Sequence, residues 1–263
     1  MIAVLSSSPP RVMVAAISGA TSGIGRATAE ILVQAGFQVI AVGRRPDRLA
    51  ELEAALGQGR ALVHSFAADV TAPGVVRELF AFSEERLGVH PDVFILCAGR
   101  GLPGSLLTSD ESKWDQLIQV NQLAAMRQLR DCAELFRSRA ATAGAPVPGV
   151  RDIVVLGSTV GRQLSPGNPV YGATKFALHS LVESLRQEVC SAGIRVTLIE
   201  PGFVRTEFQQ TAAYDMERFD ALEEEVGPFL QAHDVARAIE FVIRQPPHVH
   251  IDDLRIRPTR QRA

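Results

Sequence analysis

One of the two tyrosines of this 263-residue chain, Tyr171, stands four positions before one of its two lysines, Lys175, in "VYGATKFAL" (170–178). On a helix, residues four apart share a face, so the phenol and the ammonium are expected to lie one turn apart. A free tyrosine has a pKa of about 10, and a neighbouring ammonium favours the phenolate and lowers that value. The pair therefore predicts a group that transfers protons near neutral pH, beside a lysine that can also hold ribose hydroxyls.

Two polar residues upstream suit the same task. Ser158, in "VVLGSTVG", ends a strand candidate at the edge where open α/β sheets bind ligands, and its hydroxyl can hydrogen bond to a substrate carbonyl. Asn121 stands in the middle of a helix candidate, where Asn is a mediocre helix former. It is either a solvated surface residue or a buried polar residue with a task, and its apolar neighbours at helical spacing favour burial.

The elements that must position these residues follow an α/β pattern. Short apolar runs alternate with longer amphipathic segments, which predicts a doubly wound parallel sheet between two layers of helices. The strand candidates are 12–17, 37–42, 61–67, 92–96, 152–157 and 194–199, and the helix candidates are 24–35, 46–56, 73–87, 111–139 and 171–191. The length suits a single domain over 1–263, with a flexible start at 1–11. Segment 205–230 contains no strand candidate and is expected to cover the substrate as an excursion over the sheet's edge.

A glycine-rich turn, "ISGATSGIG" (17–25), follows the first strand candidate and leads into a helix. Glycine lets the backbone approach a ligand closely, and free N–H groups at a helix start favour a pyrophosphate. An ordinary strand-to-helix turn is the alternative, but the position in the first βαβ unit favours a dinucleotide. The cofactor-binding residues expected here are Gly19, Thr21, Ser22, Gly23, Ile24 and Gly25.

The end of the second strand candidate bears on the choice of cofactor. It carries Gly43, Arg44 and Arg45 and no acidic residue, whereas sites selective for NAD place Asp or Glu near this point to bind the ribose hydroxyls. A guanidinium holds a 2′-phosphate through two parallel hydrogen bonds, so the sequence favours NADP(H) and makes NAD less suitable. Two solvated arginines at a helix start are the alternative.

Two further strand ends face the expected cofactor. Asp69 either accepts a hydrogen bond from the adenine, with Val70 packing on the ring, or caps the next helix. Ala98 and Gly99 either leave room for a cofactor ribose or form a plain turn.

Composition narrows the class of partner. The formal net charge of −2, with acidic and basic residues intermingled, provides no basic face for nucleic acid or an anionic membrane, so a small molecule is expected. No stretch approaches the roughly 20 apolar residues of a membrane span. Three cysteines without metal or disulfide spacing predict a reducing cytoplasm and no metal site.

The chain resembles the short-chain dehydrogenases/reductases over nearly its whole length. The matching motifs are "SGATSGIG" (18–25), "DV" (69–70), "CAG" (97–99), Asn121, Ser158, "YGATK" (171–175) and "PGFVRT" (201–206), in the family's order and spacing. Two positions depart from the family: Ser18 stands for the usual Thr, and Cys97 for an Asn that commonly braces the neighbouring turns. The resemblance implies a Rossmann sheet of seven strands, with the seventh near "HVHIDDLRIRP" (248–258), and a homodimer or homotetramer.

The resemblance also implies roles for the site residues. Tyr171 would be the acid/base, Lys175 would tune its pKa and anchor the ribose, Ser158 would orient the carbonyl, and Asn121 would hold a proton-relay water. Gly202 and Thr206 would lie along the nicotinamide half of the cofactor, and the cofactor-binding residues expected in the same segment also include Pro201 and Val204.

The expected function is that of an NADP(H)-dependent carbonyl reductase or alcohol dehydrogenase. A catalytically silent dinucleotide sensor or scaffold is an alternative, disfavoured because the proton-transfer set is complete. Epimerisation or dehydration of a nucleotide sugar is another, disfavoured by the lack of a longer C-terminal substrate domain. Phe208, Tyr214, Met216 and Phe219 either cover an apolar substrate or form a small core. With no Arg or Lys clearly directed at the pocket, the sequence favours a neutral or apolar ketone.

Overall fold

A single seven-stranded parallel sheet organises the protein. The computed structural model describes residues 12–57, 62–142 and 150–262, so the predicted flexible start lies outside the described residues. The strand order is β3-β2-β1-β4-β5-β6-β9, and the chain reverses its direction of travel across the sheet between β1 and β4. The strands are β1 Val14–Ser18, β2 Gln38–Gly43, β3 Val63–Ala67, β4 Val93–Leu96, β5 Arg151–Leu156, β6 Ile194–Pro201 and β9 Asp253–Ile256. This arrangement confirms the predicted doubly wound sheet.

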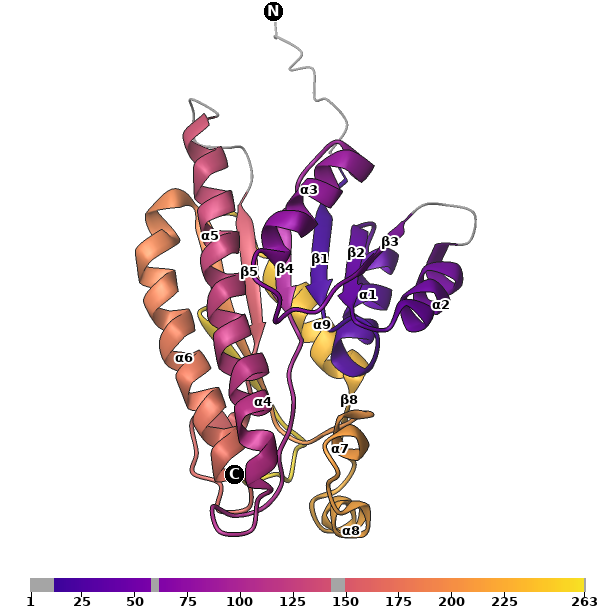
Figure 1. The fold of residues 1–263 in the computed structure, drawn as a ribbon, viewed down its shortest axis with the longest axis vertical. Coiled ribbons are helices and arrows are strands. Elements are labelled where there is room, and N and C mark those ends of the chain that lie inside the picture. Colours follow the sequence, from indigo (N-terminus) through magenta and orange to yellow (C-terminus); the bar gives the residue numbers. More distant parts are fainter. Residues whose placement is uncertain (1–11, 58–61, 143–149, 263) are drawn as a thin grey trace, which may run out of the picture.

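Helices cover both faces of the sheet (Figure 1). On one face lie α3 Val75–Leu87, α5 Ala125–Thr142 and α6 Pro169–Val189, and on the other lie α1 Gly23–Gln34, α2 Pro46–Gly57 and α9 Ala232–Ile243. Along β1, Val14 and Ala16 join the core under the first group, while Ala15 and Ile17 join the core under the second. Successive side chains of a strand point to opposite faces, which is why strands covered on both sides read as continuous apolar runs.

The predicted helix over 111–139 is in fact a series of helical segments. A short 3-10 turn, η1 Glu111–Lys113, leads into α4 Trp114–Ile118, then a π-helical turn, η2 Gln119–Ala124, and finally α5. Asn121 lies in the π turn and is buried. Such turns insert an extra residue into a helix and often occur at functional sites.

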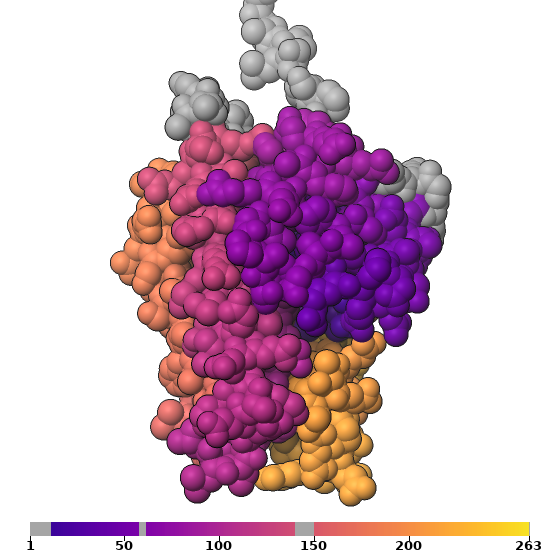
Figure 2. Space-filling view, viewed as in Figure 1, coloured from indigo at the N-terminus to yellow at the C-terminus, as the bar shows by residue number. Residues whose placement is uncertain are grey.

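Segment 205–230, called the lid below, lies beyond the carboxyl ends of the strands. It contains α7 Phe208–Thr211 and α8 Met216–Val226, and in Figure 2 it forms an orange lobe below the indigo N-terminal half. The prediction that it contains no strand is wrong at both ends, since β7 Val204–Arg205 pairs with β8 Leu230–Gln231. That pairing closes the base of the lid.

Aromatic side chains give the lid a small core of its own. Phe219 lies 4.7 Å from Phe229 between ring centroids, and Phe203 lies 5.1 Å from Phe229. Arg205 covers the Phe219 ring at 5.5 Å and forms ion pairs with Asp220 and Glu223. The lid is therefore a packed unit.

Near the C-terminus, one helix is missing from the sequence prediction, whereas the seventh strand lies within the predicted segment 248–258. Helix α9 is absent from the predicted set, although it packs tightly against α1. The seventh strand, β9, begins after the two histidines of "HVHIDD", so His248 and His250 precede the strand. The imidazole of His250 instead lies 3.1 Å from both the backbone nitrogen and oxygen of Val196. Within the described residues, no helix is both long and apolar enough to cross a membrane.

Candidate active site

A cavity of about 880 Å³ runs along the carboxyl ends of the strands, from the end of β2 to the lid. Every residue that the sequence predicted to bind a cofactor lines this cavity, and so does Ser158. Those residues are Gly19, Thr21, Ser22, Gly23, Ile24, Gly25, Arg44, Arg45, Asp69, Val70, Ala98, Gly99, Tyr171, Lys175, Pro201, Gly202, Val204 and Thr206. Of the four predicted catalytic residues, only Asn121 does not line the cavity, because it lies behind the cavity wall.

Tyr171 and Lys175 lie on the buried side of α6, one turn apart as predicted. The Lys175 ammonium is 5.7 Å from the centroid of the Tyr171 ring and donates a hydrogen bond to the backbone oxygen of Leu156 at 2.9 Å. Ser158 Oγ accepts a hydrogen bond from the backbone nitrogen of Val160 at 3.4 Å, and its hydroxyl is close enough to the Tyr171 phenol to lower the pKa of that group. Three groups capable of proton transfer or carbonyl binding thus meet at one wall of the cavity.

A close backbone approach brings the serine to the tyrosine. Ser158 precedes the 3-10 turn η3 Thr159–Gly161, and a Cβ added to Gly161 would lie 2.9 Å from the Lys175 backbone oxygen. Glycine therefore allows this turn to pack directly on α6. The contact sets the distance between the strand end that carries Ser158 and the helix that carries Tyr171.

Burial dominates the protonation of both helix residues. It raises the pKa of Tyr171, with the Tyr214 phenol adding to the rise and the Ser158 hydrogen bond opposing it. Burial also lowers the pKa of Lys175 to about 8. The expectation that the pKa of Tyr171 lies below its usual value is therefore wrong for the protein without cofactor or substrate, because desolvation of the phenolate is the largest effect. Tyr171 is protonated at neutral pH, as a proton donor must be.

Asn121 connects the loop after β4 to α6. Its Oδ1 accepts a hydrogen bond from the backbone nitrogen of Arg100 at 2.8 Å, and its Nδ2 donates to the Arg100 oxygen at 2.9 Å and to Thr174 Oγ1 at 3.1 Å. The side chain is 2% exposed, so burial is the correct alternative of the two considered. These contacts hold the loop at Gly99 between Asn121 and Lys175. If a Cβ were added to Gly99, it would lie 3.6 Å from Asn121 Oδ1 and 3.9 Å from Lys175 Nζ.

The glycine-rich turn packs against the end of β4. Gly19 has φ of 75°, and a Cβ there would lie 2.8 Å from the backbone nitrogen of Ala98, while a Cβ on Gly25 would overlap the Gly19 oxygen. Side chains at these positions would fill the space between the two strand ends. Behind the turn, burial raises the pKa of the Cys97 thiol to about 12, so this group is neutral.

The arginines at the end of β2 both reach the cavity. Arg45 donates to Thr21 Oγ1 at 2.9 Å and lies 3.8 Å from the Glu207 carboxylate. Arg44 lies 4.0 Å from the Asp69 carboxylate. Asp69 itself accepts hydrogen bonds from the Thr71 backbone nitrogen and hydroxyl, both at 2.9 Å, which hold its pKa below the usual range. Its carboxylate thus stabilises a local turn and does not cap the next helix, whose N-cap is Gly74.

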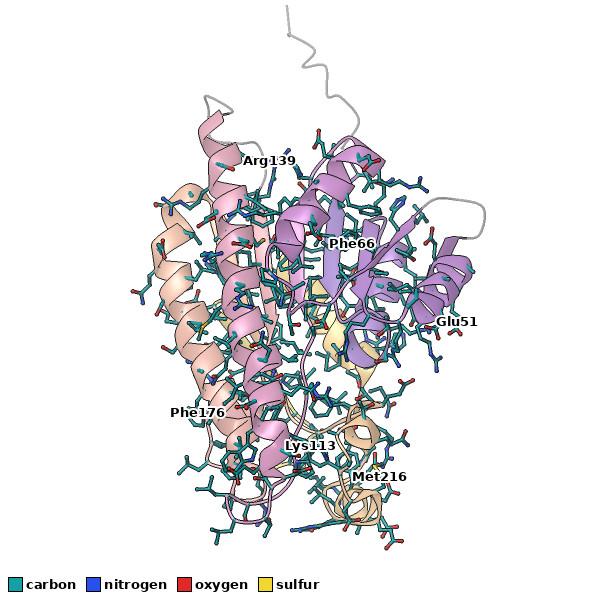
Figure 3. The ribbon with its side chains drawn as sticks, in the orientation of Figure 1. Glu51, Phe66, Lys113, Arg139, Phe176 and Met216 are labelled. Carbon is teal, nitrogen blue, oxygen red and sulfur yellow. The ribbon has the colours of Figure 1, made fainter. Side chains whose placement is uncertain are left out.

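The four lid residues considered from the sequence divide between two roles. Phe208 and Tyr214 line the cavity, Phe219 lines it and also belongs to the lid core, and Met216 does not line it. Figure 3 places Met216 at the lower edge of the molecule. A Cβ added to Gly101 would lie 2.7 Å from the Phe208 ring, so the lid packs directly on the loop after β4.

Several polar residues near the lid lie in segments that the sequence predicted for the pocket, although the sequence did not single them out. Arg100 and Arg218 line the cavity, and Asn168 donates a hydrogen bond through Nδ2 to the Tyr214 hydroxyl at 3.3 Å. No local signal in the sequence pairs positions 168 and 214, because the folding of the lid brings them together. Across the described part of the chain, no group of three or more His, Cys, Asp or Glu residues is placed to hold a metal ion.

Known proteins resemble the chain in both sequence and structure. A family model described as short chain dehydrogenase matches residues 13–217. Dehydrogenase/reductase SDR family member 11 of Bos taurus is 34% identical over 256 residues, which cover 94% of this chain and 96% of the relative. An uncharacterized oxidoreductase of Staphylococcus epidermidis is 29% identical over 245 residues, which cover 93% of this chain and 96% of the relative.

Solved structures agree with the sequence relatives. A closed form of serine dehydrogenase complexed with NADP+ has a TM-score of 0.81 at 28% identity and covers 95% of this chain and 97% of its own. An alcohol dehydrogenase from the archaeon Thermococcus sibiricus, complexed with 5-hydroxy-NADP, has a TM-score of 0.79 at 26% identity over 96% of this chain and 99% of its own.

Proposed function

The chain belongs to the short chain dehydrogenase family and is an oxidoreductase, and we propose that it uses NADP(H) to interconvert a ketone or aldehyde and an alcohol. The observation that carries the proposal is the meeting of Ser158, Tyr171 and Lys175 at one wall of a cavity that also contains the glycine-rich turn and two arginines. A proton donor and a cofactor cradle in one cavity suit hydride and proton transfer to the same carbonyl group.

The cavity residues fit a nicotinamide dinucleotide with a 2′-phosphate. Gly19 and Gly25 let the turn pack closely on itself and on the end of β4, and this turn lines the cavity at the start of α1, where backbone N–H groups can bind a pyrophosphate. At the end of β2, a Cβ on Gly43 would lie 2.5 Å from Thr21 Cγ2, so an acidic side chain of the kind that selects NAD would require Thr21 to move. Arg44 and Arg45 would hold the 2′-phosphate, and the NADP in the two structural relatives supports this choice.

When bound, the nicotinamide cofactor supplies or accepts the hydride. In the direction of reduction, Tyr171 donates its proton to the carbonyl oxygen, and burial keeps the phenol protonated until that step. Ser158 hydrogen bonds to the same oxygen and orients it. Lys175, charged below a pKa of about 8, stabilises the phenolate that forms and is placed to hold ribose hydroxyls. Asn121 would hold a relay water only after rearrangement of its present contacts, so its first role is to fix the loop after β4.

The proposal is tested by absorbance assays of NADPH and NADH oxidation with aldehydes, aromatic ketones, β-keto esters and diketones. Turnover with NADPH preferred is expected. Arg44→Asp should raise the KM for NADPH about tenfold to a hundredfold and leave the KM for NADH nearly unchanged, because only the 2′-phosphate loses charged hydrogen bonds. Arg48→Asp is the matched control, since Arg48 lies on α2, pairs with Glu51 at 3.3 Å and does not line the cavity. Equal weakening of both cofactors by Arg44→Asp would remove the argument for NADP.

We also propose a homodimer or homotetramer of this chain in the cytoplasm. On α6, Leu178, Val182 and Val189 pack into the core, whereas Ala173 and Phe176 are exposed on the outer side, where a second copy can pack. All three cysteines are free thiols, which suits a reducing compartment. Sedimentation velocity should show an oligomer that Phe176→Glu shifts to smaller species, and a wild-type protein that sediments only as a monomer would refute the assembly.

A further inference from the structure

The second tyrosine of the chain, Tyr214, faces the same cavity as the first. The side chain comes from the lid, and its hydroxyl accepts a hydrogen bond from Asn168 Nδ2 at 3.3 Å. With the amide in this orientation, the contact occupies a lone pair of the phenol oxygen and leaves its proton free to donate. Tyr214 therefore presents an unused hydrogen-bond donor to whatever lies between the lid and Tyr171.

The backbone before Tyr214 holds the ring in this position. Ala213 has φ of 57° and is the only non-glycine residue with a positive φ in the described parts of the chain. Such a conformation is unfavourable for alanine and persists only where surrounding contacts fix it. Here the Ala213 and Tyr214 nitrogens donate to the backbone oxygens of Gln210 and Gln209 at 3.1 and 2.9 Å.

The ring of Phe208 lies beside the rings of both tyrosines. The Phe208 centroid is 6.0 Å from that of Tyr171 and 6.3 Å from that of Tyr214. A substrate whose carbonyl contacts Tyr171 thus lies in a part of the cavity that Phe208 and Tyr214 also line. A second polar group on that substrate would meet the free phenolic proton.

A cationic residue, Arg218, lies four positions after Tyr214 in the lid. Arg218 lines the cavity, and within the described residues its guanidinium has no ion pair or hydrogen bond, whereas Arg205 of the same lid pairs with Asp220 and Glu223. The nearest acidic residue that lines the cavity is Asp215. Its carboxylate accepts a hydrogen bond from the backbone nitrogen of Arg218 at 3.0 Å. Arg218 is therefore a charge that the fold itself does not neutralise.

The cavity as a whole favours anions. Five of its lining side chains are cationic and two, Asp69 and Asp215, are carboxylates. The cofactor phosphates account for Arg44 and Arg45 in the proposed function, which leaves Arg100 and Arg218 in the substrate half. One phenol and one exposed guanidinium beside Asp215 match a single negative charge better than the double charge of a phosphate.

We propose that Tyr214 and Arg218 bind a carboxylate of the substrate, so that the enzyme interconverts oxo acids and hydroxy acids. This inference rests on the proposed function and replaces the neutral ketone favoured by the sequence. The hydride goes to the carbonyl carbon and the proton from Tyr171 to its oxygen, while the carboxylate is unchanged by the reaction. Recognition of the acid is the role of the lid.

The test uses acids and their methyl esters in matched pairs: 2-oxobutanoate, 3-oxobutanoate and 4-oxopentanoate, each assayed with NADPH against its ester. At least one acid should have a kcat/KM about tenfold above its ester. Tyr214→Phe and Arg218→Gln should each lower the kcat/KM of that acid about tenfold and change the ester's much less. Arg237→Gln on α9, an exposed arginine that pairs with Asp234, is the control and should change neither.

A binding measurement separates recognition from chemistry. Calorimetry with the NADPH complex should show butanoate binding more tightly than methyl butanoate, and Arg218→Gln should remove the difference. Esters turned over as well as acids in every pair would overturn the inference and leave the proposed function standing. Preferential binding of butanoate without turnover of any probe would instead retain carboxylate recognition and count against the proposed function. Equal binding of butanoate and its ester would overturn the inference whatever the turnover.

Discussion

Replacing Lys175 by methionine removes a buried ammonium and retains most of its volume. The lysine is 6% exposed, and burial lowers its pKa from 10.5 to about 8. Each unit of pKa corresponds to about 1.4 kcal/mol, so holding this side chain charged in the folded protein costs about 3 kcal/mol. The charged form of Lys175 therefore destabilises the folded protein, because the side chain is buried in the wall of the cavity.

The cost has a defined pH dependence. The unfolded chain keeps the lysine proton up to about pH 10.5, whereas the folded protein loses it near pH 8. Between these values the unfolded state binds more protons, so raising the pH favours the folded state. The free energy of unfolding of the wild type should therefore rise relative to that of Lys175→Met by about 3 kcal/mol between pH 7 and pH 10.5.

Urea titrations followed by circular dichroism at pH 7, 8, 9 and 10 measure this difference. The variant also leaves the Leu156 oxygen without its 2.9 Å donor, at a cost of about 1 to 3 kcal/mol, but that cost does not vary with pH. Lys113→Met is the control, because Lys113 is half-exposed and pairs with Asp110 on the surface. A difference between wild type and Lys175→Met that stays constant from pH 7 to pH 10 would refute the reasoning.

Three further substitutions test the packing around the site. Gly19→Ala should weaken NADPH binding and lower the Tm, because the new methyl group would lie 2.8 Å from the Ala98 nitrogen; an unchanged NADPH titration would contradict the close approach. Asn121→Ala should cost about 1 to 3 kcal/mol in urea unfolding, because it removes the hydrogen-bond partners of both the Arg100 backbone nitrogen and the Arg100 backbone oxygen; an unchanged unfolding midpoint would contradict these contacts. Phe136→Ala should cost about 3 to 5 kcal/mol and leave the KM for NADPH unchanged, because Phe136 packs on Phe80 in the core; a loss below 1 kcal/mol would be inconsistent with that packing.

The parts of the fold that the sequence predicted are those whose signals are local. The apolar run and the glycines of "VAAISGATSGIG" specify a buried strand, a turn and a helix start within a few residues, and Tyr171 and Lys175 share a helix face through their spacing alone. The π turn at Asn121 was missed because apolar periodicity does not reveal one extra residue in a helix. The direction of the Tyr171 pKa was missed because desolvation depends on the lid and loops that bury the phenol.

The substrate half of the site depends on contacts between distant segments. Asn168 and Tyr214 are 46 positions apart, and they meet because the lid folds on its own aromatic core and on Gly101. Within the described residues, Arg218 has no ion partner. This is evident only from the folded lid, because there Arg205 pairs with both Asp220 and Glu223. Composition and spacing do not encode such pairings, so the sequence favoured a neutral substrate.

The most direct test of the central claim is the turnover of Tyr171→Phe with NADPH and the best carbonyl substrate of the wild type. The variant keeps the ring and loses the proton donor, so kcat should fall about a hundredfold to ten-thousandfold while the dissociation constant for NADPH stays within about twofold. A variant that retains turnover within tenfold of the wild type would contradict the assignment of Tyr171 as the proton donor.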